Sequence, residues 1–486
     1  MLHKKNASLW LILLLLTLPV KAQNAAATKL PDTPAGGRVA AYVKAFNSGD
    51  EQVMRQFIAE NVAPSALQQR PVEARIEIYR NMRSDLGRLE LRRVAEASES
   101  AIKVLAQSKE GEWLELGFQF EPQPPHKLLG LRVERVDAPQ TAAGEVKTPA
   151  SLTEAQAVAF VENYLKELVA ADEFSGTVLL AKGDRPIFQQ AYGLASKEFN
   201  VPNRVDTKFN LGSINKIFTQ VAIGQLVAQG KLSFDDKLGK FLPDYPNRDA
   251  ADKVTIRQLL DMKSGIGDFF GPRFESTPKN SLRAIKDFLP LFAGAPLAFE
   301  PGTSRQYSNG GYIVLGAIIE KASGQDYYEY VREHVFKPAG MHNADWYEAD
   351  MPTPNLASGY IRAGTDSNGK PARKSNLYTR PAKGSPAGGG YAAAEDLLKF
   401  SLALQTGKLR LPDFRGTAGA EKRTSTEGKP PNFPGLGIAG GAPGINAILE
   451  VDGETGYTLI VMSNYDPPSA MEVGKKIRGW LAQIKN

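Results

Sequence analysis

The chain has 486 residues, of which 42% are apolar, and it contains no cysteine. The lack of cysteine excludes disulfides, a thiolate nucleophile and a zinc–thiolate site, so ordinary hydrophobic cores must supply the stability. The formal net charge of +6 includes Lys4, Lys5 and Lys21, and the +3 that remains without them is too small to indicate nucleic-acid binding. At about 150 residues per domain, this length predicts two or three domains.

The N-terminal residues have the pattern of a secretory signal peptide. Lys4 and Lys5 precede an apolar stretch, Leu9 to Val20, of roughly a dozen residues, which is shorter than the ~20 needed to span a bilayer. Val20 and Ala22 suit the −3 and −1 positions before a cleavage site. We therefore expect residues 1–22 to be removed and the protein to be exported to the periplasm or the extracellular space, with no stable membrane span. An uncleaved anchor is the alternative.

A small α+β domain is predicted over residues 38–137, between two linkers. The linkers, residues 23–37 and 138–150, are rich in Ala, Pro, Thr and Gly. Helical patterns come first in the domain and alternating strand patterns follow. The expected elements are a helical stretch over Arg38–Val62 that is interrupted at Asn47–Asp50, a second helix over Val72–Leu86, a strand over Trp113–Glu121 and another around Leu129–Val133.

One phrase in this domain, Tyr42–Asp50 (YVKAFNSGD), resembles the opening of nuclear-transport-factor-2-like domains. The resemblance implies a cone-shaped fold. A ligand inside the cone is one interpretation, but no pair of acidic and basic residues demands it. A packing, dimerising or substrate-gating role is the interpretation that we favour.

A larger domain is predicted over residues 151–486. A capping-box pattern at Ser151–Glu154 begins a helix, and hairpin patterns lie near both ends of the domain, with helical patterns between them. Strands at both ends predict an antiparallel sheet flanked by helices, with a helical insertion. The hairpin strands are expected over Ser175–Ala181 with Pro186–Tyr192 and over Ile445–Val451 with Tyr457–Ser463, and a last helix over Met471–Ile484.

Several kinds of active site are disfavoured by the residues present. Only His126, His334 and His342 remain after signal removal, and the first lies in the small domain, which argues against a Ser-His-Asp site. The chain has neither a Gly-x-Ser-x-Gly elbow nor a His-Glu-x-x-His pair. His334 and His342 lack the spacing of metal ligands, so we expect no metal and no cofactor. A serine enzyme here needs a base other than histidine.

Ser213 and Lys216 offer such a base. Residues three apart on a helix share a face, so the lysine amine can reach the serine hydroxyl. Apolar residues surround the helix that continues to about Ala228, which predicts a buried central helix. Burial disfavours the charged form of lysine and lets it accept a proton near neutral pH. The alternative for this motif alone is a capping serine followed by a solvated lysine.

Further motifs extend this pattern. They are FNLGSINKIFTQ (209–220), VTIRQLLDMKSG (254–265), the segment Tyr307–Gly324 that opens YSNGGY, and SPAGGGYAAAEDL (385–397). Together and in this order they resemble class C β-lactamases, D-alanyl-D-alanine carboxypeptidases and related serine esterases. The resemblance implies a β-lactamase/penicillin-binding-protein-like α+β fold and a serine hydrolase that forms an acyl-enzyme. The implied substrate is a small molecule or peptide with an ester or amide bond, β-lactams included.

The resemblance also assigns roles. Ser213 is the implied nucleophile, and Lys216 activates it. Tyr307 is implied to share a proton with Lys216 and to pass it to the leaving group, and Asn309 is implied to hold a substrate amide or ester oxygen. Without the resemblance, Tyr307 and Asn309 are equally compatible with the start of a buried helix.

A third motif departs from the family pattern. Relatives carry Lys-Thr-Gly or His-x-Gly there, whereas this chain has GIAGGAPG over residues 437–444, with Ile438 in the place of the cation. Gly440 and Gly441 are kept, so substrate can approach the strand and the Gly441 N–H is the expected second oxyanion donor. A site without the cation should bind a carboxylate poorly, which favours a neutral ester or amide. The alternative function is a catalytically weak or inactive binding or sensor protein.

Two other groups of residues are interpreted as structural. Three helical tyrosines should pack rather than bind substrate. A basic stretch rich in Gly, Pro and Ser favours a solvated loop, with a position beside the cleft as the alternative. These groups are Tyr327, Tyr328 and Tyr330, and Lys370, Arg373, Lys374, Arg380 and Lys383. The sequence indicates no oligomeric state.

Overall fold

The computed structural model describes residues 30–98, 100–109, 111–136, 151–365, 371–412 and 433–484. It divides into two compact units, residues 1–147 and 148–486. The signal-peptide prediction and the linker predicted over residues 138–150 fall outside the described residues. No helix in the described part of the chain is long and apolar enough to cross a membrane.

In the described part of the first unit, four helices precede a four-stranded antiparallel sheet of order β1-β2-β3-β4. Alternate residues of β3 are buried, as the pattern predicts, and pack on the helices. Helix α1 begins at Pro34, inside the predicted linker, because the Thr33 side chain accepts a hydrogen bond from the Gly36 N–H and caps it. The cone-like resemblance stays a prediction. The elements are α1 Pro34–Ser48, α2 Glu51–Asn61, α3 Pro64–Gln69, α4 Val72–Leu86, β1 Glu90–Ala97, β2 Ala101–Gln107, β3 Trp113–Phe120 and β4 Leu128–Val136.

A five-stranded antiparallel sheet of order β13-β14-β15-β5-β6 organises the second unit. Strand β15 pairs with β5, so the two predicted hairpins join into one sheet although they lie at opposite ends of the domain. Strand β13 forms one edge. The strands are β5 Gly176–Lys182, β6 Arg185–Tyr192, β13 Leu436–Ala442, β14 Ile445–Val451 and β15 Tyr457–Ser463.

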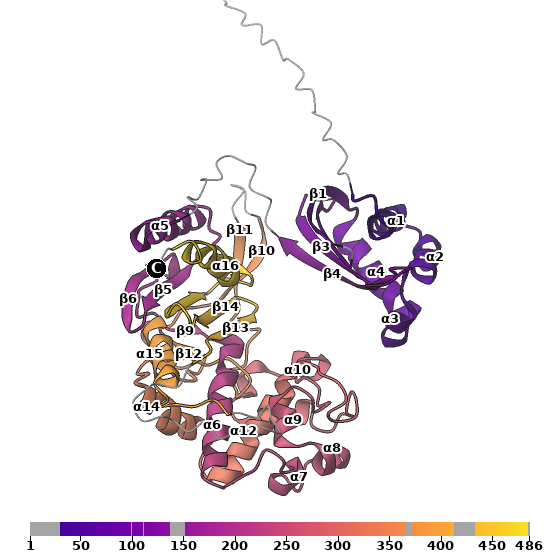
Figure 1. Cartoon of the computed structure of the whole chain (residues 1–486). Coiled ribbons are helices and arrows are strands. Elements are labelled where there is room, and N and C mark those ends of the chain that lie inside the picture. Colours follow the sequence, from indigo (N-terminus) through magenta and orange to yellow (C-terminus); the bar gives the residue numbers. More distant parts are fainter. Residues whose placement is uncertain are drawn as a thin grey trace, which may run out of the picture. The chain divides into compact units, whose positions relative to one another are not determined.

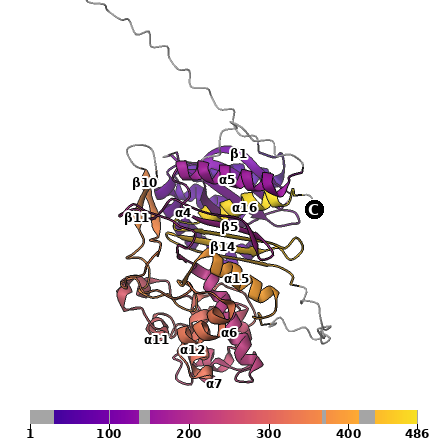
Figure 2. The ribbon, with the colours of Figure 1, turned by 90° about the vertical axis from the view of Figure 1, so that its left-hand side faces the viewer.

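Helices cover both faces of this sheet (Figures 1 and 2). Helices α5 (Glu154–Ala170) and α16 (Ser469–Leu481) share one core with one face. The core on the other face includes α15 (Ala394–Gln405) and the central helix α6 (Lys216–Ala228). The capping box of α5 is formed by Thr153 and Gln156 and not by Ser151 and Glu154. The side chains of Thr153 and Gln156 each accept a hydrogen bond from the backbone N–H of the other.

The helical insertion lies between β9 and β12 in the chain and packs around α6, most of whose residues are buried. Tyr327, Tyr328 and Tyr330 are buried in its core, which confirms their packing role. The remaining elements are β7 Leu194–Ser196, β8 Val201–Pro202, β9 Phe209–Asn210, η1 Gly212–Asn215, α7 Leu238–Phe241, α8 Arg248–Lys253, α9 Ile256–Leu260, α10 Pro272–Ser276, η2 Lys279–Ser281, α11 Ile285–Phe288, η3 Leu289–Leu291, α12 Asn309–Ser323, α13 Tyr327–Val331, η4 Arg332–Phe336, α14 Lys337–Ala339, β10 Tyr360–Thr365, β11 Pro371–Ser375 and β12 Tyr391–Ala392.

Candidate active site

Ser213 lies in η1, a single tight turn that leads directly into α6. This places its hydroxyl at the N-terminal end of a buried helix, where backbone N–H groups lack intrahelical partners and the helix dipole is positive. Gly212 before it has a φ of +49°, a conformation that favours glycine. The turn therefore presents Ser213 next to backbone donors that can stabilise a developing negative charge.

Lys216 is 6% exposed and lies beneath Ser213. Its Nζ donates to Ser213 Oγ at 3.1 Å, to Asn309 Oδ1 at 2.7 Å and to the Ala387 carbonyl at 2.6 Å. Burial lowers the pKa of Lys216 from 10.5 to about 7, although the negative charge of Asp268 opposes this shift. A substantial fraction of this amine is thus neutral near pH 7 and able to accept a proton.

Tyr307 precedes α12 and faces Ser213 from the helical insertion. Its hydroxyl lies 2.6 Å from Ser213 Oγ, and its ring centroid lies 4.8 Å from Lys216 Nζ. Ser308 caps α12 by accepting from the Gly311 N–H at 2.8 Å, and this cap fixes the start of the helix. Withdrawal from water raises the pKa of Tyr307, even though the residue is 53% exposed. Tyr307 therefore stays a neutral phenol at the pH at which Lys216 begins to lose its proton.

Asn309 is held at both ends of its side-chain amide. Oδ1 accepts from Lys216, and Nδ2 donates to Asp268 Oδ2 at 2.7 Å. The role of this amide in holding a substrate oxygen stays a prediction, and its two contacts within the protein join Lys216 to Asp268. Asp268 was missed. It lies three residues beyond the VTIRQLLDMKSG motif, and extending that motif would have been the signal.

Two glycines let the edge strand β13 lie against the Ser213 turn. A Cβ on Gly440 would stand 2.0 Å from the Leu211 carbonyl oxygen and 2.9 Å from Ser213 N. A Cβ on Gly212 would stand 2.9 Å from Gly441 N. Because no side chain separates the two segments, the backbone N–H groups of Ser213 and Gly441 lie on adjacent segments beside the candidate nucleophile.

The resemblance places Ile438 where the resembled families carry a cation. It is half-buried and packs against the main core. Side chains of a strand alternate between its faces, so Ile438 points to the same side of β13 as Gly440. It is not among the described residues that line the pocket at Ser213. The cation is therefore replaced by an apolar contact with the core.

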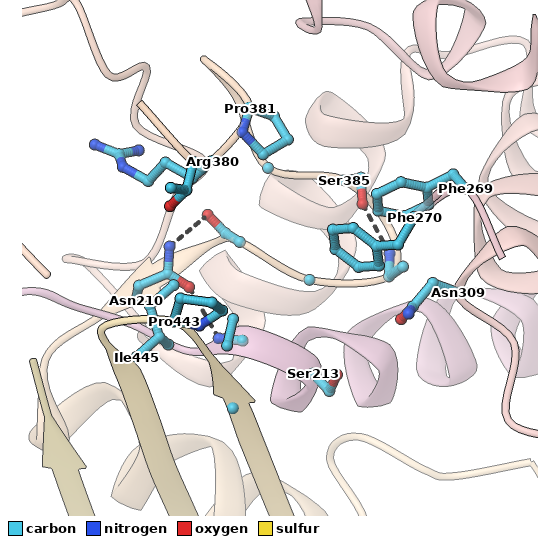
Figure 3. A pocket seen from close by; sticks show the side chains of 18 of the residues that line it. Asn210, Ser213, Phe269, Phe270, Asn309, Arg380, Pro381, Ser385, Pro443 and Ile445 are labelled. Atoms are coloured by element: carbon cyan, nitrogen blue, oxygen red, sulfur yellow. Dashed lines mark hydrogen bonds between the residues drawn. The ribbon is translucent and has the colours of Figure 1, made fainter. Parts of the chain in front are cut away.

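A pocket of about 330 Å³ opens at Ser213 (Figure 3). Its wall is largely apolar, and Arg380 is the only charged residue among the described residues that line it. In Figure 3 the Arg380 guanidinium points away from Ser213. The lining includes Asn210, Ser213, Phe269, Phe270, Tyr307, Asn309, Arg380, Pro381, Ser385, Gly441, Pro443 and Ile445.

The basic stretch is not simply a solvated loop. Arg380 borders the pocket, and the Arg373 side chain is only 5% exposed because its guanidinium lies 3.4 Å from the Tyr465 ring centroid. Lys370 falls outside the described residues. For Arg380, the structure thus agrees with the alternative prediction, a position beside the cleft, and not with a solvated loop.

The predicted site residues thus meet at one end of one pocket. Ser213, Tyr307, Asn309 and Gly441 line it, while Lys216 lies beneath Ser213 and Gly440 lies against the Ser213 turn. In the described ranges, no group of three or more His, Cys, Asp or Glu residues is placed to hold a metal ion. A hydroxyl, a low-pKa amine and a phenol in mutual contact are suited to proton transfer and nucleophilic attack.

Comparisons with known proteins identify the family of this chain. The model of the Beta-lactamase family matches residues 161–483. The chain is 33% identical to penicillin-binding protein 4* of Bacillus subtilis over 194 residues, which are 39% of this chain and 42% of that protein. It is 29% identical to esterase EstB of Burkholderia gladioli, over 61% of this chain and 82% of that protein.

A solved structure shows the same fold. The penicillin-binding protein from Bacillus halodurans superposes with a TM-score of 0.55 and 33% identity, and the match covers 64% of this chain and 98% of that one. The family match includes the sheet, the insertion and every residue of the pocket. On sequence and on fold, this chain belongs to the beta-lactamase family.

Proposed function

We propose that the protein is a serine hydrolase that acts on a small neutral ester or amide through an acyl-enzyme on Ser213. The observation that carries the proposal is the contact of the Ser213 hydroxyl with both Lys216 Nζ and the Tyr307 hydroxyl. Relatives named as an esterase and as penicillin-binding proteins support the class of reaction.

The reaction follows from the pKa order at the site. Ser213 Oγ attacks the carbonyl carbon while its proton passes to neutral Lys216, whose pKa of about 7 suits it to act as the base. The Ser213 and Gly441 N–H groups stabilise the oxyanion. As the bond to the leaving group breaks, the Tyr307 hydroxyl protonates the departing oxygen or nitrogen, and the proton held by Lys216 restores the phenol. Water then attacks the acyl-enzyme by the same steps in reverse.

The pocket favours a neutral substrate. Ile438 replaces the cation, the wall is largely apolar, and Arg380 points away from Ser213. A carboxylate next to Ser213 would therefore lose its hydration without a cation beside it. The volume of about 330 Å³ is at the small end of ligand pockets, so the group next to the scissile bond is small.

The decisive experiment is intact-mass spectrometry of the purified protein after exposure to a fluorophosphonate and, separately, to a penicillin. We expect a phosphonate adduct on the wild type and none on Ser213→Ala, with both proteins folded by circular dichroism. A penicilloyl adduct would extend the substrates to β-lactams. No adduct from either reagent on the folded wild type would contradict the proposal.

The absence of adducts would favour a binding or sensor protein with this fold. The observation that favours that second function is Ile438, because it removes an electrostatic group from the site. Loss of one such group typically costs about 10² to 10³ in rate, which leaves activity measurable. Turnover therefore remains the better supported function.

We also propose that the protein acts outside the cytoplasm. The support is the charged and then apolar pattern of residues 1–22. Expression of the full chain followed by cell fractionation and N-terminal sequencing tests it, and we expect a mature start at Gln23. Retention of the full chain in the cytoplasm would contradict the proposal.

A further inference from the structure

Asp268 lies behind Asn309, on the side away from Lys216. Its Oδ2 accepts from Asn309 Nδ2 at 2.7 Å and from the Asn309 backbone N–H at 3.3 Å. Its Oδ1 accepts from the Phe270 N–H at 3.1 Å. Both oxygens of the carboxylate are therefore engaged by N–H donors from two different segments, and the side chain is fixed in place.

This contact gives the Asn309 amide a single orientation. An ionised carboxylate only accepts hydrogen bonds, and an ammonium group only donates them. The amide nitrogen must therefore face Asp268, and the amide oxygen must face Lys216. A flipped amide would place its oxygen against the carboxylate, which is repulsive whether Lys216 is charged or neutral, and would also set its NH2 group against Lys216 when that amine is charged.

We propose that Asp268 is a positioning residue of the active site, which fixes the Asn309 amide and thereby holds Lys216 Nζ against Ser213 Oγ. The inference rests on the proposed function, because it requires Ser213 as nucleophile and Lys216 as its base. Neither Asp268 nor its contact with Asn309 belongs to the site predicted from the sequence.

The charge of Asp268 has a second, separable effect. It favours the ammonium form of Lys216 and so raises the pKa that burial lowers. The other groups that face Lys216 are the rings of Tyr307 and Tyr312, whose centroids lie 4.8 and 5.5 Å from Nζ. Both rings are uncharged near neutral pH, because an ordinary phenol has a pKa of about 10 and burial raises the pKa of each further. Asp268 is thus the carboxylate that acts on this amine.

The test measures the rate of fluorophosphonate labelling of Ser213, and the turnover of p-nitrophenyl acetate, at pH values on both sides of 7. Asp268→Asn should lower the plateau rate about 10-fold or more, since a hydrogen bond to a charged group is lost and the Asn309 amide is free to flip. The acidic limb of the pH–rate profile, where the rate rises with pH, should move to lower pH in this variant, because loss of the negative charge lowers the pKa of Lys216. Asp268→Glu keeps the charge but misplaces the oxygens, so it should lower the plateau and leave the limb nearly in place.

Asp236→Asn is the matched control. Its carboxylate also accepts a backbone N–H, from Ser233, and pairs with Lys240, and its side chain is 17% exposed. It lies outside the pocket, so its removal should leave plateau and limb at wild-type values. In an Asn309→Ala background, Asp268→Asn should no longer lower the plateau, because no amide remains to be oriented.

Three results would overturn the inference. The first is a folded Asp268→Asn variant whose plateau rate and acidic limb are those of the wild type. The second is an Asp236→Asn variant that shows the same changes as Asp268→Asn. The third is an Asp268→Asn change that lowers the plateau rate as strongly in the Asn309→Ala background as in the wild type. A wild type that is not labelled at all would instead overturn the proposed function, so the two failures are distinguishable.

Discussion

Replacement of Gly440 by alanine places one methyl group between the edge strand β13 and the Ser213 turn. The new Cβ would stand 2.0 Å from the Leu211 carbonyl oxygen, whereas ordinary contact begins at 3.4 Å. Backbone flanks the methyl group on both sides, so β13 and the turn must separate by about 1.4 Å to restore ordinary contact, which would carry the Gly441 N–H away from the oxyanion. A misplacement of ~1 Å or the loss of one oxyanion donor costs about 10²-fold in rate. We expect kcat/KM for p-nitrophenyl acetate to fall by about that factor.

Gly437 on the same strand supplies the matched control. A Cβ there meets nothing within 4 Å, so Gly437→Ala makes the same chemical change without a clash. It should keep kcat/KM within about 3-fold of the wild type, which corresponds to less than 1 kcal/mol in the barrier. Thermal unfolding of both variants separates loss of the fold from loss of the site. If folded Gly440→Ala matched Gly437→Ala in kcat/KM, the argument from close approach would be refuted.

Three further predictions follow from the same site. The wild-type kcat/KM should rise with pH through about 7, since only neutral Lys216 accepts the Ser213 proton, and a pH–rate profile with its midpoint near 10.5 would contradict this. Lys216→Met should raise the free energy of unfolding in urea by about 1–4 kcal/mol at pH 7. The folded pKa of Lys216 lies below its unfolded value of 10.5, so this gain should shrink as pH rises towards 10.5, and a gain independent of pH would count against burial as the cause. Ile438→His should improve kcat/KM for carboxylate-bearing esters more than for matched neutral esters, and equal gains would refute the role given to the missing cation.

Local patterns in the sequence were enough to predict much of the architecture. Alternation of apolar and polar residues identified β3, because the side chains of a half-buried strand repeat every two residues. Short apolar runs on either side of turn residues identified β5 and the hairpin of β14 and β15. The resemblance of the motifs identified the family, which the comparisons confirm. Patterns were weaker at boundaries, as at Pro34 and Thr153, where a capping hydrogen bond decides where a helix begins.

By itself, the sequence determined that Ser213 and Lys216 share one face of a helix, since three residues nearly complete one turn. Only the tertiary structure brought Tyr307 to Ser213 across 94 residues and the Ala387 carbonyl to Lys216 across 171. The same packing lowers the pKa of Lys216, because burial is a property of all the surrounding segments and not of the motif. An extended motif would reach Asp268 in the sequence, but only the fold shows that the Asn309 amide lies against its carboxylate.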